Sequence, residues 1–252
     1  MYKNILHHIE HRDYPLPHGP WLATQKWNHL LFMHLPISKD TLIKYIPKSL
    51  ELDTYDDSAW ITIIPFKVSN MRPRKLPPIP FLQSYLELNV RTYVKHNGRQ
   101  GIYFFSLDAD KLLAVLGARL ATLPYFYANI NMKKKEDTFY FNTKRKGKSK
   151  ATFKGSYRPV SEAYYPKRSS LTYWLLERYF LWSYRNNSLF RGDIHHKQWK
   201  IYDVETTIVS ENMLSFLPDD TMIGEPIFHY ASSKRVLFWP IKKNRVNELL
   251  HR

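Results

Sequence analysis

Eight short runs of β-branched and aromatic residues follow one another along this chain, most of them with only short connections. Runs of this length and composition are typical of strands. A doubly wound sheet would need a helix between most strands, and too few helical segments are present for that. We therefore predict an α+β protein dominated by a large, mainly antiparallel sheet or barrel. The runs are AWITIIPF, SYLELNVRTYV, GIYFFSLDA, DTFYFNTK, ATFKGSYRP, KQWKIYDVETTIV, EPIFHYAS and RVLFWPI.

Four segments have the pattern of helices. A weak one covers residues 3–11, and the next follows Ser38, a typical N-cap residue, and stops at Pro47. Residues 111–122 are apolar nearly all round, which predicts a buried helix. The longest predicted helix begins near Ser169 and runs through SSLTYWLLERYFLWSYR.

Two hairpins are indicated by their turn residues. Asn97 and Gly98 stand between two alternating runs, which is a strong signal for a type I′ turn. In TKRKGKSKATF, Gly147 marks the tip of a second hairpin whose turn holds most of the lysines of that region. Both hairpins favour the antiparallel interpretation.

The run SYLELNVRTYV has two chemically different faces, because side chains alternate along a strand. One face is apolar and the other is polar with aromatic ends. In an open sheet the polar face would lie in water. In a closed barrel it would line the interior, and Glu87 and Arg91 would then be charged groups on the wall of a cavity.

Several segments spread over nearly the whole chain carry a family resemblance. They are WNHLLFMHLPIS, IPKSLELDTYDDSAWITIIPF, RPRKLPPIP with YLELNVRTYV, ARLATLPYFYA, LLERYFLW and FRGDIHHKQW. Together they resemble the YqjF-like family of bacterial proteins, which is grouped with the acetoacetate-decarboxylase-like superfamily. The fold of that superfamily is a β-cone, an antiparallel barrel with an internal ligand cavity and a few peripheral helices. The resemblance implies this fold for residues 1–252 as a single domain.

The resemblance also indicates where an active site would lie. Glu87 would be the counterpart of the active-site glutamate of the decarboxylase, and Tyr125 and Phe126 stand where its two adjacent lysines should be. No convincing arginine stands near residues 26–29, where the decarboxylase has an N-terminal binding residue. The decarboxylase forms a Schiff base through a desolvated lysine, and tyrosine cannot form an imine. We therefore do not expect decarboxylase activity, and whether any other reaction is catalysed is left open.

The candidate ligand-binding residues are Glu87, Arg91, Arg119 and Tyr125. Glu87 is also the candidate general acid or base, provided that its pKa is raised. Arg119, inside an apolar helix, either forms a buried ion pair or holds a ligand carboxylate in a bidentate clamp. The predicted ligand is a small organic molecule that is anionic or carries a carbonyl group. No metal and no cofactor are predicted.

Other charged residues have structural interpretations. Glu177 and Arg178 lie in an aromatic segment and are expected to form a buried ion pair. Of the adjacent His195 and His196, at most one can point inward, and a hydrogen-bonding role is expected for it. The histidines at positions 7, 8 and 11 have spacing that could bind a metal, but a frayed N-terminus is the commoner meaning.

The net charge is +16, and half of it lies between residues 133 and 158, where ten basic and two acidic residues give +8. This segment interleaves Lys and Arg with Phe and Tyr, a pairing that serves phosphate contact and base stacking. Nucleic-acid binding through this hairpin is therefore the alternative function. A solvated turn that protects a sheet edge is the simpler interpretation.

The remaining features concern location. The chain has no cysteine, which fits a reducing compartment. No apolar stretch has the length of a signal peptide or a membrane span, so we expect a soluble cytoplasmic protein. The oligomeric state is left open, a homo-oligomer included.

Overall fold

In the computed structural model, the described residues are 1–80, 82–120 and 122–244, with only the backbone described for 117–120. Strands dominate them. The strands are β1 (Ala23–Ile37), β2 (Glu51–Leu52), β3 (Ala59–Pro73), β4 (Ser84–His96), β5 (Arg99–Ala109), β6 (Tyr125–Lys135), β7 (Thr138–Arg145), β8 (Thr152–Pro159), β9 (Phe180–Arg185), β10 (Ser188–His195), β11 (Val204–Glu211), β12 (Ile227–Phe238) and β13 (Lys242–Asn244). The helices are α1 (Tyr2–His7), α2 (Lys39–Leu42), the 3₁₀ turn η1 (Ile43–Tyr45), α3 (Leu112–Leu120) and α4 (Leu171–Leu176).

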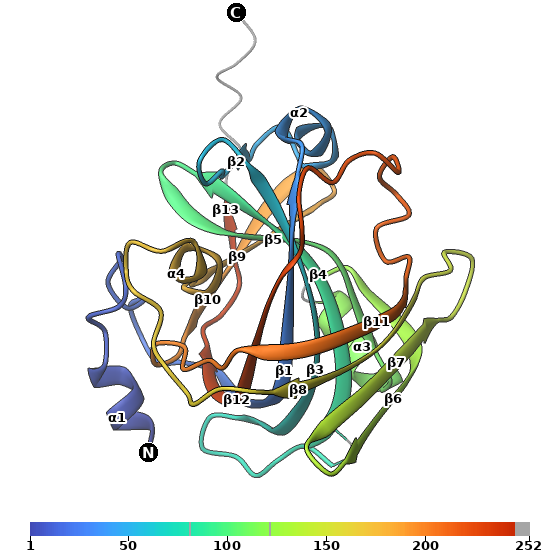
Figure 1. Ribbon diagram of the computed structural model, residues 1–252. Coiled ribbons are helices and arrows are strands. Elements are labelled where there is room, and N and C mark those ends of the chain that lie inside the picture. Colours follow the sequence, from blue (N-terminus) through green and yellow to red (C-terminus); the bar gives the residue numbers. More distant parts are fainter. Residues whose placement is uncertain (81, 121, 245–252) are drawn as a thin grey trace, which may run out of the picture.

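The sheet closes on itself into a ring. Its strands pair in the order β5, β9, β10, β12, β1, β3 and β4, and β4 pairs back with β5. All of these pairings are antiparallel except that of β5 with β9. The predicted α+β class with a mainly antiparallel barrel is therefore confirmed, with the parallel pairings of β5 as an addition (Figure 1).

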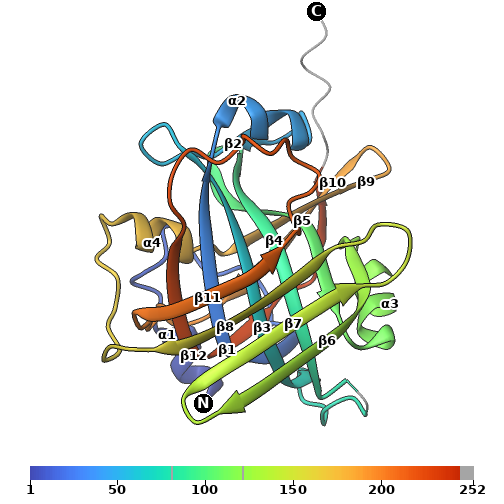
Figure 2. The same ribbon diagram turned by 45° about the vertical axis from the view of Figure 1, so that its right-hand side comes forward.

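A second layer of strands covers one side of the ring. The strand β6 pairs in parallel with the end of β5, and β7, β8 and β11 follow by antiparallel pairing. Figure 2 shows these four strands crossing in front of β1, β3 and β4. Phe139, Phe141 and Phe153 of this layer belong to the same buried cluster as Leu88 and Val90 of β4. The apolar face of β4 is thus buried between the ring and the outer strands, and its polar face points to the interior of the ring.

The helix predictions are partly right. Three of the four predicted helices exist in shortened form, as α1, as α2 with η1, and as α3. The predicted burial of α3 is wrong, because its Leu112, Leu113 and Leu116 are about half exposed. The fourth is wrong after its first half, because α4 ends at Leu176 and the chain continues as the strand β9. Among the described residues, no helix has the length and apolarity needed to cross a bilayer.

The strand predictions missed six elements and misjudged two others. None of the eight predicted runs covers β1, β2, β6, β9, β10 or β13. The runs EPIFHYAS and RVLFWPI form the single strand β12, and in KQWKIYDVETTIV the strand β11 begins only at Val204. Both predicted hairpin turns are present. Asn97 and Gly98 have φ values of 49° and 73°, as a type I′ turn requires, and Gly147 has a φ of 101°.

Candidate functional site

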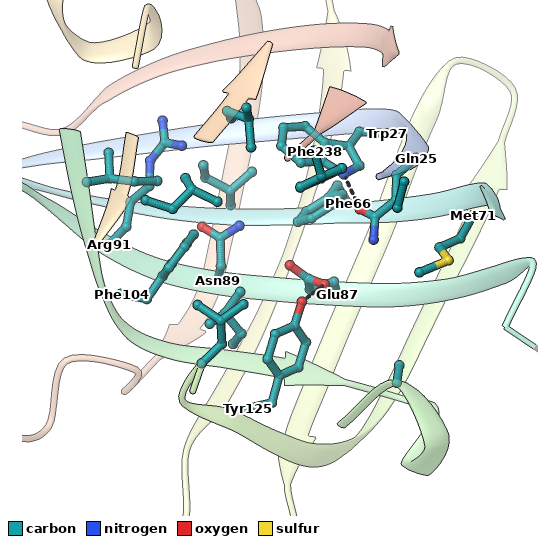
Figure 3. Close-up of a pocket in the computed structure, with 18 of the residues that line it drawn as sticks. Gln25, Trp27, Phe66, Met71, Glu87, Asn89, Arg91, Phe104, Tyr125 and Phe238 are labelled. Atoms are coloured by element: carbon teal, nitrogen blue, oxygen red, sulfur yellow. Dashed lines mark hydrogen bonds between the residues drawn. The ribbon is translucent and has the colours of Figure 1, made fainter. Parts of the chain in front are cut away.

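The ring encloses a cavity of about 690 Å³. This volume lies in the range of sites that take small organic ligands. Figure 3 shows side chains of several strands directed into it. The walls are mostly apolar, and aromatic rings supply much of their surface: Trp27, Phe32, Phe66, Phe104, Trp199 and Phe238.

The polar face of β4 forms one wall of this cavity. Tyr85, Glu87, Asn89 and Arg91 occupy alternate positions on the strand, and all four line the cavity. Each of them is at most 8% exposed. The interior-facing arrangement that a closed barrel would give is therefore the one that the structure has, and the open-sheet alternative is excluded.

Glu87 and Tyr125 meet inside the cavity. The Tyr125 hydroxyl donates a hydrogen bond of 2.8 Å to Oε2 of Glu87, and Figure 3 shows the two side chains pointing toward each other. Burial raises the pKa of Glu87 to about 7, against the opposing effect of hydrogen bonds from Tyr125 and Asn89. A carboxyl group with this pKa can give or take a proton near neutral pH.

The hydrogen bonds continue from this pair toward Trp27. The hydroxyls of Tyr85 and Tyr125 are joined by a hydrogen bond. The side-chain amide of Gln25 donates to the Tyr85 hydroxyl at 3.1 Å and accepts from Nε1 of Trp27 at 2.7 Å. Residues of β1, β4 and β6 are thus connected to Glu87 by one network, which fixes the position of its carboxyl group.

Arg91 lies at the end of the cavity that α4 covers. Its Nη2 donates a long hydrogen bond of 3.4 Å to the carbonyl oxygen of Leu175, and its buried Nε has no partner among the described residues. The neighbouring Arg178 is different, because its Nη1 lies 2.6 Å from a carboxylate oxygen of Asp53. Burial lowers the pKa of Arg178, and the positive charge of Arg91 adds to that effect. Both side chains line the cavity.

This end of the cavity carries an excess of positive charge. Asp53 already has two cations, Arg178 and Lys95, the latter at 2.8 Å. No carboxylate of the described residues forms an ion pair with Arg91. A buried cation without a counter-charge costs free energy. The amide oxygen of Asn89, on the same wall, is also buried without a described hydrogen-bond partner.

His196 presents a hydrogen-bond acceptor from another wall. Its Nδ1 lies 2.8 Å from the carbonyl oxygen of Lys197, which can only accept, so Nδ1 carries the proton and Nε2 keeps its lone pair. Burial lowers its pKa well below the ordinary value. His196 lines the cavity, whereas His195 packs outside it, with Nε2 2.8 Å from the carbonyl oxygen of Ile5. One histidine of the pair therefore points inward.

The predicted ion pair between Glu177 and Arg178 is wrong. Arg178 pairs with Asp53, as described above, while Glu177 accepts hydrogen bonds from the Tyr179 hydroxyl and from the backbone N–H of Trp199 at 2.7 Å. Neighbouring residues of a chain turn their side chains apart here, because the helix α4 ends at this point. The ion-pair partner of Arg178 lies far away in the sequence, whereas Glu177 is hydrogen-bonded by Tyr179, two residues on, and by Trp199.

The remaining sequence candidates do not add to the site. The side chain of Arg119 lies outside what the structure describes, so its proposed clamp stays a prediction. The lysines at 133–135 are exposed at the end of β6, away from the cavity wall. Within the described part of the chain, no group of three His, Asp or Glu residues could hold a metal ion.

The basic hairpin is less suited to base stacking than its sequence indicated. Of the aromatic residues between positions 133 and 158, only Tyr140 is exposed, because the others belong to the buried cluster between the outer strands and the ring. Arg145 is buried and lies 2.8 Å from Asp108, and Arg158 pairs with Glu205. The nucleic-acid hypothesis therefore depends mainly on the exposed lysines.

The comparisons with known proteins agree with this architecture. The family model described as uncharacterized conserved protein, DUF2071, matches residues 24–235. The uncharacterized protein YqjF of Bacillus subtilis (strain 168) is 44% identical over 237 residues, which cover 93% of this chain and 98% of YqjF. The chain belongs to the DUF2071 family. The predicted YqjF-like resemblance is confirmed.

Solved structures show that this family shares the fold of acetoacetate decarboxylases. An acetoacetate-decarboxylase-like enzyme from Sphingomonas wittichii RW1 has a TM-score of 0.61 at 11% identity, over 90% of this chain and 94% of that one. The acetoacetate decarboxylase of Legionella pneumophila has a TM-score of 0.60 at 15% identity, over 93% and 90%. The enduracididine biosynthesis enzyme MppR has a TM-score of 0.66 at 10% identity, over 94% of both chains.

Tyr125 and Phe126, which stand where the resemblance places the two decarboxylase lysines, point in different directions in this DUF2071 protein. Tyr125 points into the cavity and hydrogen bonds to Glu87. Phe126 points away from it, and the guanidinium of Arg145 stacks 4.1 Å from the centre of its ring. The lysine that lines the cavity among the described residues is Lys243, an exposed residue at the rim. At the first of these two positions, the cavity therefore has a hydroxyl donor where the resemblance implied an amine.

Replacing Tyr125 by phenylalanine should raise the pKa of Glu87 above about 7. The hydrogen bond from Tyr125 favours the carboxylate, and its loss leaves the effect of burial unopposed on that side. The measurement is a carbon-13 NMR titration of side-chain carboxyl groups, with the Glu87 signal assigned through Glu87→Gln. Tyr127→Phe, two positions along the same strand at an exposed site, is the control and should leave the titration unchanged. An unchanged Glu87 titration in Tyr125→Phe would contradict the assigned role.

Proposed function

We propose that this protein binds an amphipathic monocarboxylic acid in the cavity of its β-ring, with the carboxylate at Arg91. The observation that supports this most directly is a buried guanidinium on the cavity wall without a carboxylate partner among the described residues. A ligand carboxylate would supply the missing charge and accept the hydrogen bond that Nε does not make. Arginine forms such bonds in a bidentate geometry.

The rest of the wall indicates the remainder of the ligand. Glu87 and Arg91 are four residues apart on one strand, a spacing of about 13 Å between Cα atoms. The wall opposite and around them is apolar, with Phe66, Phe104 and Phe238 among its residues. An acid with a hydrocarbon middle of medium length fits this surface. A hydroxyl or carbonyl group at its other end would reach the Glu87 and Tyr125 pair.

One structural neighbour supports a pocket for organic acids. One structure of MppR is described as its complex with pyruvate, and another as its complex with the condensation product of pyruvate and imidazole 4-carboxaldehyde. These ligands belong to MppR. They support the proposal only in that a protein of the same fold holds an oxo acid.

The proposal is tested by isothermal titration with ligands that differ in one property at a time. Octanoate should bind at least about thirtyfold more tightly than octanamide, because only the acid offers a charge to Arg91. It should bind more than about a hundredfold more tightly than acetate, because each buried methylene adds about 0.8 kcal/mol. Equal affinity for octanoate and octanamide would overturn the role of Arg91, and equal affinity for acetate would overturn the role of the apolar wall.

A further inference from the structure

The rim of the cavity exposes large apolar side chains to solvent. Leu22, Leu113 and Ile241 line the cavity, yet they are 57%, 55% and 39% exposed. Leu22 also lines a neighbouring hollow together with Leu76, which is 58% exposed. Clusters of this kind are rare on protein surfaces that face only water, and they mark sites of contact with another apolar phase.

The helix α3 contributes most to this surface. Leu112, Leu113 and Leu116 are about half exposed, whereas Val115 is buried in the core and Ala114 lines the cavity. With 3.6 residues per turn, positions i, i+1 and i+4 fall within an arc of about 100° on a helix. The outer face of α3 is therefore apolar over its first described turns, where a helix that only covers a barrel would carry polar residues.

Cations lie beside Leu22, Leu76 and Ile241. Lys243 lines the cavity itself, and Arg74, Lys75 and Lys242 line the hollow that Leu22 and Leu76 share. No aspartate or glutamate is among the described residues that line this hollow or the adjacent one beside Arg72. The rim thus combines exposed leucines with positively charged side chains, which are called the positive collar below.

We propose that this rim, made of Leu22, Leu76, Leu112, Leu113, Leu116, Ile241, Arg74, Lys75, Lys242 and Lys243, docks on the surface of an anionic lipid bilayer. Apolar side chains that enter the boundary between headgroups and acyl chains, flanked by cations that meet anionic headgroups, are the two elements of interfacial binding. A second copy of this chain fits less well, because it would bring two positive collars together.

The position of the rim gives the docking a consequence. The exposed leucines and the apolar wall of the cavity form one continuous surface, since Leu22, Leu113 and Ile241 belong to both. An amphipathic acid could pass from the bilayer into the cavity without its hydrocarbon part crossing water. This consequence rests on the proposed function, whereas the docking itself does not.

The test is sedimentation of the full chain with vesicles of phosphatidylcholine, alone or mixed with phosphatidylglycerol. The protein should bind the mixed vesicles and bind pure phosphatidylcholine at least tenfold more weakly, since each cation near an anionic surface contributes about a factor of five. Leu112→Asp with Leu116→Asp, two exposed leucines that do not line the cavity, should reduce binding to the mixed vesicles at least about tenfold. The matched control is Val160→Asp with Val209→Asp, two valines of similar exposure on or beside the outer sheet, which should bind as the wild type does.

The charges have their own control within the chain. Lys75→Gln with Lys242→Gln should weaken binding about twentyfold, whereas Lys148→Gln with Lys150→Gln, in the exposed turn of the basic hairpin, should change it less than twofold. The proposal would be overturned if the hairpin variant Lys148→Gln with Lys150→Gln lost vesicle binding instead. Unchanged vesicle binding in the double leucine variant, called the leucine pair, would also overturn it. The proposal would also be overturned if the wild type formed a dimer in solution and the two leucine substitutions made that dimer dissociate. Octanoate titration of the leucine pair separates the two proposals, because cavity binding of the dissolved acid should persist when docking is lost.

Discussion

Arg91→Met should weaken octanoate binding at least about thirtyfold without lowering the stability of the fold. Removing one partner of a buried charge pair costs about 2–5 kcal/mol of binding free energy. In the unliganded protein the same replacement removes a buried cation that has no carboxylate partner among the described residues. The melting temperature should therefore stay the same or rise. Isothermal titration and thermal unfolding measure the two effects separately.

Two further variants sharpen this test. Arg158→Met makes the same change of charge at an exposed residue of the outer sheet and should leave octanoate binding unchanged. Arg91→Lys keeps the charge but loses the fork geometry, so it should bind with intermediate affinity. A loss of affinity in Arg91→Met that comes with an equally large loss of stability would mean that Arg91 holds the barrel together rather than a ligand.

The local sequence pattern was sufficient to predict the wall of the cavity, whereas its closure was implied only by the family resemblance. The alternation of SYLELNVRTYV separates Glu87, Asn89 and Arg91 from the apolar positions, and the structure keeps this separation. Which face turns inward depends on the second layer, whose Phe139 and Phe141 cover the apolar face. That layer forms through pairings between strands distant in sequence, which local patterns do not reveal.

The missed strand β1 shows why some elements leave no periodic signal. Its second half is buried on both faces, between the cavity and the outer layer, so apolar residues follow one another without alternation. His29 has a φ of 54°, and the register with β3 shifts between Asn28 and Met33. Such an irregularity moves side chains to the opposite face and erases the period of two.

The wrong helix after Ser169 has a different cause. An apolar run of this length suits either a helix or a buried strand, and periodicity alone does not separate them. The helix α4 ends at Leu176, and the next two residues, Glu177 and Arg178, bind Trp199 and Asp53, partners that only the folded chain brings near. A turn signal was present further on, because Asn186 and Asn187 both have positive φ in the tight connection between β9 and β10.

The Glu87 carboxyl group should make the stability of the protein fall as the pH rises. Burial raises its pKa from 4.5 to about 7, so the folded state binds the proton more tightly than the unfolded state does. The stabilising contribution is fully present below pH 4.5 and is lost as the pH rises through 7. A pKa difference of this size corresponds to about 3 kcal/mol. Glu87→Gln, which imitates the protonated form, should match the wild type at pH 4.5 and be about 3 kcal/mol more stable at pH 8.

The comparison of the two proteins isolates Glu87 from the other buried groups. Glu177, Lys234 and the buried histidines also have shifted pKa values, but both proteins contain them, so their effects cancel in the difference. Glu205→Gln is the control, because Glu205 is exposed on β11. The plot of unfolding free energy against pH for Glu205→Gln should run parallel to that of the wild type. The measurement is urea unfolding at intervals between pH 4.5 and 8. Parallel curves for Glu87→Gln and the wild type would mean that the carboxyl group is hydrated, and the enclosed cavity would then no longer explain its chemistry.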